Sequence, residues 1–154
     1  PREMQFDSAR FKVLRDLAFF SGFADEQVWE TVHISTWLYR AGGEDVFVEG
    51  SAGHDIHVIT SGEVVVLRDG VELNRLRTGE CFGEIGFLDE GVHARTATVR
   101  AVSGTVLLEI DAAALRQASA GLQAVFARAF MRVMVGRVKQ ADRRYLDLAA
   151  HGHR

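Results

Sequence analysis

The sequence predicts a mainly β protein, an antiparallel barrel or sandwich with helices at both ends, on three observations. From Trp37 onward, short runs rich in β-branched residues alternate with turn signals such as AGG, EGSAG and RDG. Ten of the 15 glycines fall between Gly42 and Gly91, and glycine enters the backbone angles of tight turns at little cost. Apolar residues before and after this region follow a helical spacing instead.

The length of the chain bounds its domain organisation. Its 154 residues are enough for one hydrophobic core, whereas two domains of half this size would each be marginal. We therefore expect a single domain over residues 1–154. Within it we expect N-terminal helices over 1–34, the β region over 35–111 and C-terminal helices over 112–150.

The composition is that of a soluble globular protein, with 47% apolar and 25% charged residues. No apolar run is long enough to span a bilayer, and the N-terminus lacks the order of a signal peptide. The lone Cys81 cannot form an internal disulfide, so a reducing cytoplasm is the expected location. Because the chain begins at Pro1 rather than Met, a cytoplasmic part of a larger protein fits this expectation equally.

Residues 7–32 are predicted to be helical with a break in the middle. Asp7 is the candidate N-cap of a first helix, whose apolar positions are Phe11, Leu14 and Leu17. A second helix is predicted near residues 25–32. The apolar turn LAFFSGF joins the two.

The β region contains the runs VFV, IHVIT, EVVVL, ATVRAV and TVLLEI, separated by glycine-containing turns. Their number and spacing indicate about seven or eight short strands. Strands this short, joined by tight turns, are typical of antiparallel barrels and sandwiches.

The C-terminal region is predicted to be helical from an N-cap at Asp111 to about Ala150, with a break near 119–121. One apolar stripe suits packing on the barrel and contains Leu122, Phe126, Phe130 and Val133. A second stripe repeats at intervals of three and four, as the seam of a coiled coil does, and contains Met131, Met134, Val138, Ala141, Tyr145 and Leu148. This second stripe predicts a partner helix, a homodimer contact. The alternative is that it covers the domain's own core.

Charge is distributed unevenly along the chain. Residues 128–154 carry seven basic and two acidic side chains, whereas residues 1–127 carry 11 basic and 19 acidic ones. A solvated helix face is the commoner explanation of such a basic helix, and contact with nucleic acid or acidic lipid is the other.

The segment FGEIGFL, residues 82–88, is the first candidate for chemistry. Two glycines flank a carboxylate in a run too short for an ordinary strand, which predicts a tight turn that opens a short helix. Such a turn brings backbone N–H groups close to a phosphate, and Glu84 would then accept hydrogen bonds from a sugar hydroxyl. For the two glycines alone, an ordinary turn without a ligand is the commoner explanation.

Arg95 is the second candidate. Strand alternation places it on one face with Ala97, Val99 and Ala101, whereas Thr96, Thr98 and Arg100 point to the other face. A guanidinium on an interior face must be paired, and its planar fork matches phosphate. The alternatives are an arginine that turns out to solvent and one that pairs with Glu84. The order of a glycine-flanked carboxylate, about ten residues and an inward arginine favours a pocket for a ribose-phosphate ligand.

These residues and the segments around them resemble the cyclic-nucleotide-binding domain family. This family includes the bacterial catabolite activator proteins, the regulatory subunits of cyclic-AMP-dependent kinase and the nucleotide-gated channels. LAFFSGFADEQVWETV resembles the family's N-terminal helices, and YRAGGEDVFVEGSAGHDIHVITSGEVVVL resembles its first strands. GECFGEIGFLDEGVHARTATVRA, residues 79–101, resembles its phosphate-binding cassette. The resemblance covers nearly the whole chain.

The resemblance implies an antiparallel β-roll or jelly-roll barrel with a short helix in the cassette and a long C-terminal helix. It also implies a regulatory domain that binds cyclic AMP or cyclic GMP, has no catalytic residue, metal or cofactor, and controls an attached or partner effector. Gly83 and Gly86 would lie against the cyclic phosphate, Glu84 would bind the ribose 2′-hydroxyl, and Arg95 would pair with exocyclic oxygens. The last helix would cover the base with the region around residues 137–145. The predicted ligand-binding residues are Val66, Leu76, Phe82, Gly83, Glu84, Ile85, Gly86, Arg95, Thr96 and Ala97.

Some features depart from the family. The connection between Glu84 and Arg95, which includes DEGVHA, is a residue or two longer than usual and lacks a common proline. His57 stands where an aromatic residue is usual, and Thr96 occurs in members selective for either nucleotide. The last residues, YLDLAAHGHR, do not predict a helix-turn-helix, so no DNA-binding element is expected in this chain.

Two other functions remain as alternatives. A member of the fold that no longer binds nucleotide would act as a dimerisation or interaction module. A cupin-like metal enzyme would need His54 and His57 as ligands, but residues three apart on a strand point to opposite faces. No Ser, His and Asp set predicts a nucleophile.

Overall fold

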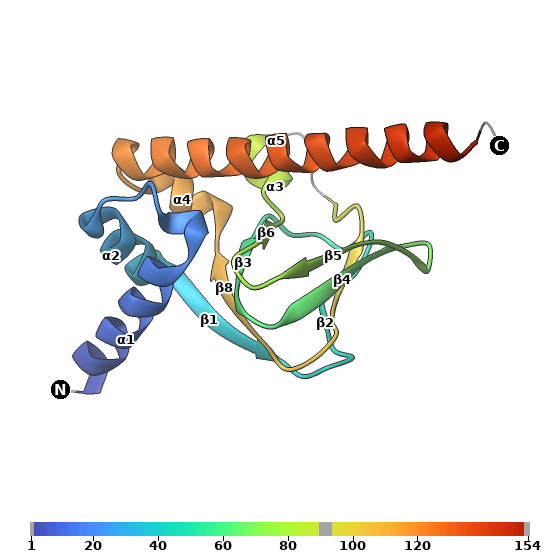
Figure 1. Ribbon diagram of the computed structural model, residues 1–154. Helices are drawn as coiled ribbons and strands as arrows, with labels where there is room; N and C mark the ends of the chain where they lie inside the picture. Colours follow the sequence, from blue (N-terminus) through green and yellow to red (C-terminus); the bar gives the residue numbers. More distant parts are fainter. Residues whose placement is uncertain (1, 90–93, 153–154) are drawn as a thin grey trace.

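The computed structural model describes residues 2–89 and 94–152 and consists of a β-roll with one group of helices before it and one after it in the chain, which pack against each other and against the roll (Figure 1). The N-terminal group comprises α1 (Arg2–Asp16), the 3-10 turn η1 (Ala18–Phe20) and α2 (Asp25–Ile34). The roll is formed by β1 (Ser35–Arg40), β2 (Asp45–Phe47), β3 (Ile56–Ser61), β4 (Glu63–Arg68), β5 (Val71–Arg77), β6 (Cys81–Phe82), β7 (Thr98–Ala101) and β8 (Thr105–Ile110). The short helix α3 (Ile85–Leu88) follows β6, and the chain continues after β8 into α4 (Ala112–Gln117) and α5 (Ala120–His151).

The roll is built from two antiparallel sheets of four strands. Their strand orders are β1-β8-β3-β6 and β2-β7-β4-β5. The β4–β5 hairpin turns at Asp69 and Gly70, which both have positive φ, as the predicted RDG turn requires. In the second sheet Val64 pairs with both Leu76 and Ala101, so β4 joins β5 to β7.

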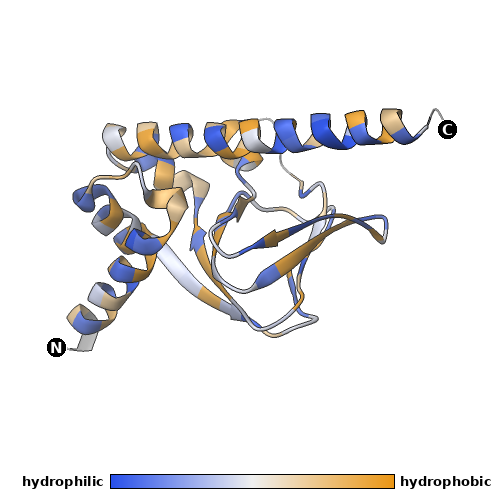
Figure 2. Ribbon diagram, viewed as in Figure 1, coloured by the Kyte–Doolittle hydropathy of each residue, from blue (hydrophilic) through white to orange (hydrophobic). Residues whose placement is uncertain are grey.

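Two apolar clusters hold these elements together. The smaller cluster fills the roll between the sheets and includes Ile59, Leu76, Phe82, Val99 and Leu107. The larger one lies between the first sheet and the helices, where Leu108 and Ile110 of β8 meet the aromatic rings of η1 and α5. Alternation along β8 therefore gives one apolar face to each cluster. Figure 2 shows the apolar residues on the facing sides of helices and strands.

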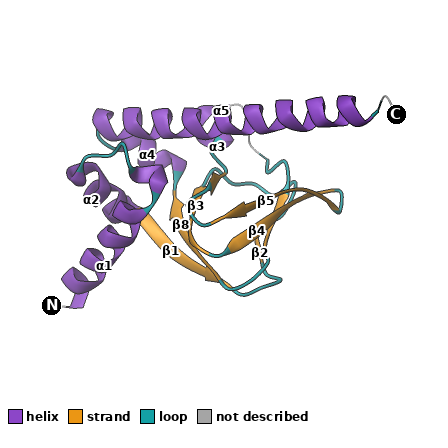
Figure 3. Ribbon diagram, viewed as in Figure 1, coloured by secondary structure: helices purple, strands orange, loops and turns teal. Residues whose placement is uncertain are grey.

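The long helix α5 has an anchored half and an exposed half. Ser119 caps its start by accepting from Leu122 N, and the hydroxyl of Ser119 also donates to Glu30 of α2 at 2.6 Å. Phe126 and Phe130 are fully buried, whereas all described residues from Val138 onward are exposed. Figure 3 shows this helix running over the roll, with its C-terminal end reaching past the β4–β5 hairpin.

The predicted fold class is confirmed in its main features, since strands and helices follow the expected order. The predicted cap at Asp111 and the predicted break near 119–121, between the last two helices, are also confirmed. The cap at Asp7 is wrong, because α1 begins at Arg2 and Asp7 forms an ion pair with Arg10 inside it. No helix of the described residues is both long and apolar enough to cross a membrane.

The second apolar stripe of the last helix does not cover the domain's own core. Met134 is 40% exposed, and Val138, Tyr145 and Leu148 are more than 60% exposed. The alternative that the stripe packs internally is therefore wrong. The stripe is an unpartnered surface on α5 within the described chain.

Candidate functional site

A cavity of about 210 Å³ opens between the second sheet, the β6–α3 turn and α5. Nine of the ten predicted site residues line it: Val66, Leu76, Phe82, Gly83, Glu84, Ile85, Arg95, Thr96 and Ala97. The tenth, Gly86, lies in α3. The space is below the roughly 300–1,000 Å³ of drug-sized sites, so it suits one small ligand.

The floor of the cavity is the sharp turn at Gly83. Its φ is +82°, and an added Cβ would lie 2.6 Å from the carbonyl oxygen of Asp55. Only glycine fits here, because a side chain would be strained and would also collide with the backbone. Glu84 then begins α3, and its carbonyl accepts from Phe87 N and Leu88 N. The predicted turn that opens a short helix is therefore present.

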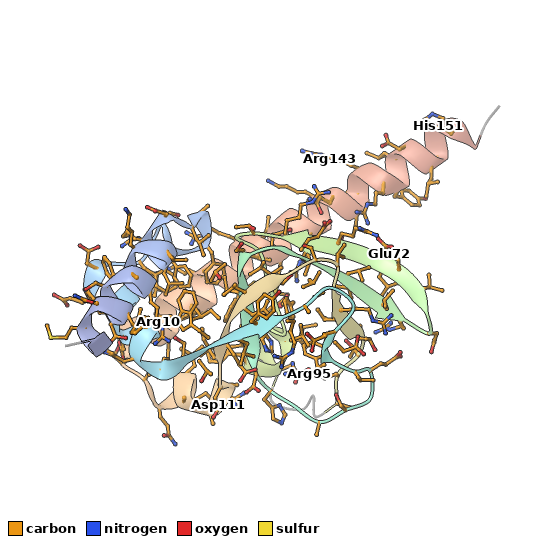
Figure 4. The ribbon with its side chains drawn as sticks, turned by 90° about the horizontal axis from the view of Figure 1, so that it is seen from below. Arg10, Glu72, Arg95, Asp111, Arg143 and His151 are labelled. Atoms are coloured by element: carbon orange, nitrogen blue, oxygen red, sulfur yellow. The ribbon has the colours of Figure 1, made fainter. Side chains whose placement is uncertain are left out.

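Arg95 forms one wall and is only 9% exposed (Figure 4). Its backbone is held on both sides by the preceding loop, because Arg95 N donates to Ser51 O at 2.8 Å and Gly50 N donates to Arg95 O at 2.7 Å. The guanidinium lies over the ring of Phe47, with Cζ 4.1 Å from the ring centroid, and donates to Asp55 O at 3.0 Å. Within the described residues, the buried Nε of Arg95 has no hydrogen-bond partner.

The prediction that Arg95 faces inward is confirmed, but the prediction that it lies on a strand is wrong. β7 begins at Thr98, and the residues before it pair with the loop at Ser51 through an isolated bridge, Ala52 to Ala94. Buried and exposed residues still alternate from Arg95 to Val102. Neither alternative for Arg95 holds, because it is neither turned to solvent nor paired with Glu84.

The electrostatics of this wall favour an anion. Burial lowers the pKa of the Arg95 guanidinium, while the nearby carboxylates of Asp55 and Glu109 oppose that shift. Burial also raises the pKa of Asp55, and the charge of Glu109 adds to this effect. Arginine nevertheless stays charged in proteins, so a cation lies in the cavity with no carboxylate hydrogen-bonded to it among the described residues.

Glu84 lies at the floor of the cavity, and its charged side chain is only 4% exposed. It accepts a hydrogen bond at Oε1 from Arg137, which α5 carries to the mouth of the cavity. The same guanidinium donates to the carbonyl oxygen of Cys81. One arginine thus connects α5 to both β6 and the start of α3.

A second polar pair lies behind the floor. His57 of β3 is 2% exposed, stacks on Phe82 with ring centroids 5.0 Å apart, and its Nε2 lies 3.0 Å from Glu109 Oε2. The hydrogen bond from His57 holds the pKa of Glu109 below its ordinary range. His57 therefore packs beneath the cavity, against Phe82.

Neither the Cys81 thiol nor the metal-binding types of side chain among the described residues form a nucleophilic or a metal site. Burial raises the pKa of the Cys81 thiol to about 12, so this thiol stays protonated. Within residues 2–89 and 94–152, no three His, Cys, Asp or Glu side chains are arranged to hold a metal ion. His54 precedes β3 and does not share a strand with His57.

Sequence reasoning missed several residues of the cavity. They come from β2, the following loop, β5, the segment before β7 and β7 itself, and are Phe47, Gly53, Asn74, Ala94 and Val99. Arg137 also lines the cavity, at the start of the region that the resemblance places over the base. Asn74 and Val99 could have been found by alternation from Leu76 and Ala97. Residues 90–93, most of the DEGVHA connection, lie outside the described residues, so its predicted effect on the rim stays a prediction.

Comparisons with known proteins agree with the fold. The family model for the cyclic nucleotide-binding domain matches residues 38–120, more than half of the chain. The cGMP-dependent protein kinase egl-4 of Caenorhabditis briggsae is 32% identical over 93 residues, which are 60% of this chain and 12% of the kinase. The chain therefore spans only a small part of this relative.

Solved structures give the same fold. The regulatory domain of Toxoplasma gondii PKA, crystallised with cAMP, superposes with a TM-score of 0.70 at 15% identity, over 84% of this chain and 51% of that one. The N-terminal domain of a transcriptional regulator from Streptomyces coelicolor A3(2) superposes with a TM-score of 0.61 at 29% identity, over 84% and 92% of the two chains.

Proposed function

Because this chain belongs to the cyclic nucleotide-binding domain family, we propose that its cavity binds a cyclic purine nucleotide, cyclic AMP or cyclic GMP. Arg95 carries the proposal. Its guanidinium is nine-tenths buried in the cavity, and the carboxylates nearest to it make no hydrogen bond with it among the described residues. An unpaired buried charge is costly, and a phosphate with two free oxygens would supply the missing partner.

The other lining residues suit the rest of such a ligand. The phosphate would lie between Arg95 and the turn at Gly83, where the backbone leaves room because no Cβ is present. The ribose 2′-hydroxyl would donate to Glu84, since an ionised carboxylate only accepts hydrogen bonds. The base would rest on the apolar side chains of Val66, Leu76 and Val99, with Thr96 and Ala97 beside it.

Regulation would follow from the contact between Arg137 and Glu84. A ribose hydroxyl at Glu84 competes with Arg137 for the same carboxylate, so ligand binding would release α5 to settle over the base. The ligand shifts α5 only by its differential affinity for the two helix positions. We propose that an attached or partner effector responds to this movement.

Calorimetry of the chain with cyclic AMP, cyclic GMP and 5′-AMP tests the proposed ligand. We expect saturable binding of at least one cyclic nucleotide in the micromolar range or tighter, and weaker binding of 5′-AMP, whose phosphate is not held in a ring. No heat with either cyclic nucleotide at high micromolar concentration would support the alternative, a member of the fold that serves only as an interaction module.

We also propose a homodimer through α5, with Met134, Val138, Ala141, Tyr145 and Leu148 at the contact. These residues are exposed and repeat at intervals of three and four, as the seam between two helices does.

We further propose that the chain works in the cytoplasm, without a cofactor, as a binding domain. The buried free thiol of Cys81 supports a reducing compartment. No DNA-binding role is proposed for the described residues.

A further inference from the structure

A second hollow, a groove of about 460 Å³, lies between β5 and the exposed half of α5. Arg75 and Arg77 contribute to it from the strand, and Arg143 and Arg144 from the helix. We call this hollow, lined by these four residues, the arginine groove. Asn74 lines both the groove and the cavity described above, so the two sites adjoin.

Strand alternation explains the two arginines of β5. Leu76 is 3% exposed and lines the cavity with Asn74, so Arg75 and Arg77 point to the other face. On α5, Gln140 and Arg144 follow Arg137 by three and seven residues, which keeps them on the side of the helix that faces the roll. Sequence and fold together bring four arginine residues to the lining of one groove.

Carboxylates match only part of this charge. Glu72 accepts from Arg75 Nε at 2.5 Å, but one oxygen of Glu63 serves both Arg75 at 3.9 Å and Arg77 at 3.4 Å. Glu80 is the acidic side chain in the lining, and it already accepts from Arg77 N. Arg143 and Arg144 form no ion pair with any carboxylate of the described chain.

We propose that the arginine groove is a second anion site that binds a polyphosphate chain and thereby holds α5 against the roll. Guanidinium forks match phosphate oxygens in pairs, and four forks in one groove fit several linked phosphates better than one carboxylate. Glu63 and Glu72 of the β4–β5 hairpin, and Glu80 in the turn after it, disfavour the long phosphate backbone of a nucleic acid. The polyphosphate is either free or part of a nucleoside triphosphate.

The groove lies where a bound anion would fix the position of α5 and so regulate the cavity. A polyanion that bridges Arg75 and Arg77 to Arg143 and Arg144 keeps α5 where Arg137 occupies Glu84. Polyphosphate therefore opposes cyclic nucleotide binding, and the antagonism is reciprocal. Only this antagonism rests on the proposed function, because the anion site itself does not need a cyclic nucleotide.

The site is tested by titrating the chain with tripolyphosphate and with ATP at constant chloride concentration. We expect saturable binding of tripolyphosphate that weakens by about tenfold or more in Arg143→Gln/Arg144→Gln. The control Arg128→Gln/Lys139→Gln removes the same charge from α5 outside the groove and should keep wild-type affinity. Tighter binding of ATP would identify a nucleoside triphosphate as the source, and equal binding would identify free polyphosphate.

Three results would overturn the anion site. They are the absence of saturable binding at millimolar tripolyphosphate, binding unaffected by the groove substitutions, and equal losses in both double variants. The antagonism predicts that saturating tripolyphosphate weakens cyclic nucleotide binding about fivefold in the wild type and not in the groove variant. Unchanged affinity would overturn the antagonism, and a chain that binds tripolyphosphate but no cyclic nucleotide would end the proposed function while the anion site stands.

Discussion

Two arginines line the same cavity but are held in different ways. Arg95 belongs to the roll, where the backbone of Gly50 and Ser51 fixes it and Phe47 covers its guanidinium. Arg137 belongs to α5 and reaches the cavity from a helix whose second half is exposed. Arg137 is already paired with Glu84, whereas Arg95 has no carboxylate hydrogen-bonded to it among the described residues.

This difference separates recognition from response. The cation on the roll is rigid and buried, so it loses little freedom when an anion binds and gains the partner that burial denies it. The cation on α5 leaves an existing partner when a ligand reaches Glu84, so its movement reports that the site is filled. The following predictions test that division, beginning with the largest effect.

Arg95→Leu removes the buried guanidinium of the roll and leaves Arg137 as the arginine at the cavity. We expect the affinity for cyclic nucleotide to fall by at least about tenfold, because a charge-assisted bidentate contact is lost. The free energy of unfolding should fall by no more than about 1 kcal/mol, since an apolar side chain replaces a buried cation that lacks a carboxylate partner. Calorimetry and urea unfolding measure the two effects.

Arg100→Leu is the matched control for this substitution. Arg100 lies on β7, is exposed and pairs with Asp45 on the outside of the roll. Its removal should leave cyclic nucleotide affinity unchanged. Equal losses in the two variants, or unchanged affinity in Arg95→Leu, would mean that Arg95 has no special part in binding.

Val138→Asp tests the outer side of the helix that carries Arg137. Val138 is 61% exposed in the centre of the apolar stripe, and two aspartates facing each other across a helix pair repel and must lose water. We expect light scattering to show a dimer for the wild type and a monomer for the variant. A monomeric wild-type chain would end the dimer proposal. Gln140→Asp, on the side that faces the roll, should leave the dimer intact.

The comparison also explains what sequence could predict of the site. Gly83, Glu84 and Arg95 were found because each has a local signal: glycines around a carboxylate, and an arginine in register with small buried residues. The contacts that fix Arg95 come from residues about 40 positions earlier, Gly50, Ser51 and Asp55. No local pattern reports such a contact, so the loop that holds Arg95 could be seen only in the fold.

Arg137 illustrates the same limit on the helix. Family resemblance indicated that the region around residues 137–145 would cover the ligand, but helical spacing alone does not identify which polar residue reaches inward. Its partners, Glu84 and Cys81, lie more than 50 residues away in the chain. The error at Asp7 has a different cause, because an aspartate inside a helix that pairs with Arg10 has the same local sequence as an N-cap.

Arg137→Gln removes the ion pair with Glu84 and so tests whether Arg137 competes with the ligand. Because Arg137 competes with the ribose hydroxyl, we expect cyclic nucleotide affinity to rise by about two- to fivefold. Amide exchange in residues 138–151 should accelerate, since the contact between α5 and the floor of the cavity is lost. Calorimetry and hydrogen exchange measure these effects. An affinity loss of about tenfold or more would show that Arg137 binds the ligand directly and does not compete with it.

Glu109→Gln should have the smallest effect, and it tests whether the roll carries its own titrating groups. His57 holds the pKa of Glu109 below its ordinary value of 4.5, so the ionised form stabilises the fold above that pH and this stability is lost as pH falls through the lowered value. The pKa of Asp55 shifts in the opposite direction, mainly through burial, which both proteins share; the smaller part due to the charge of Glu109 is lost in the variant and works against the expected difference. Between about pH 5 and pH 3 the wild type should therefore lose more stability than the variant, by less than about 1 kcal/mol in urea unfolding. Equal losses of stability would mean that the His57–Glu109 pair contributes through packing and not through the charge of Glu109.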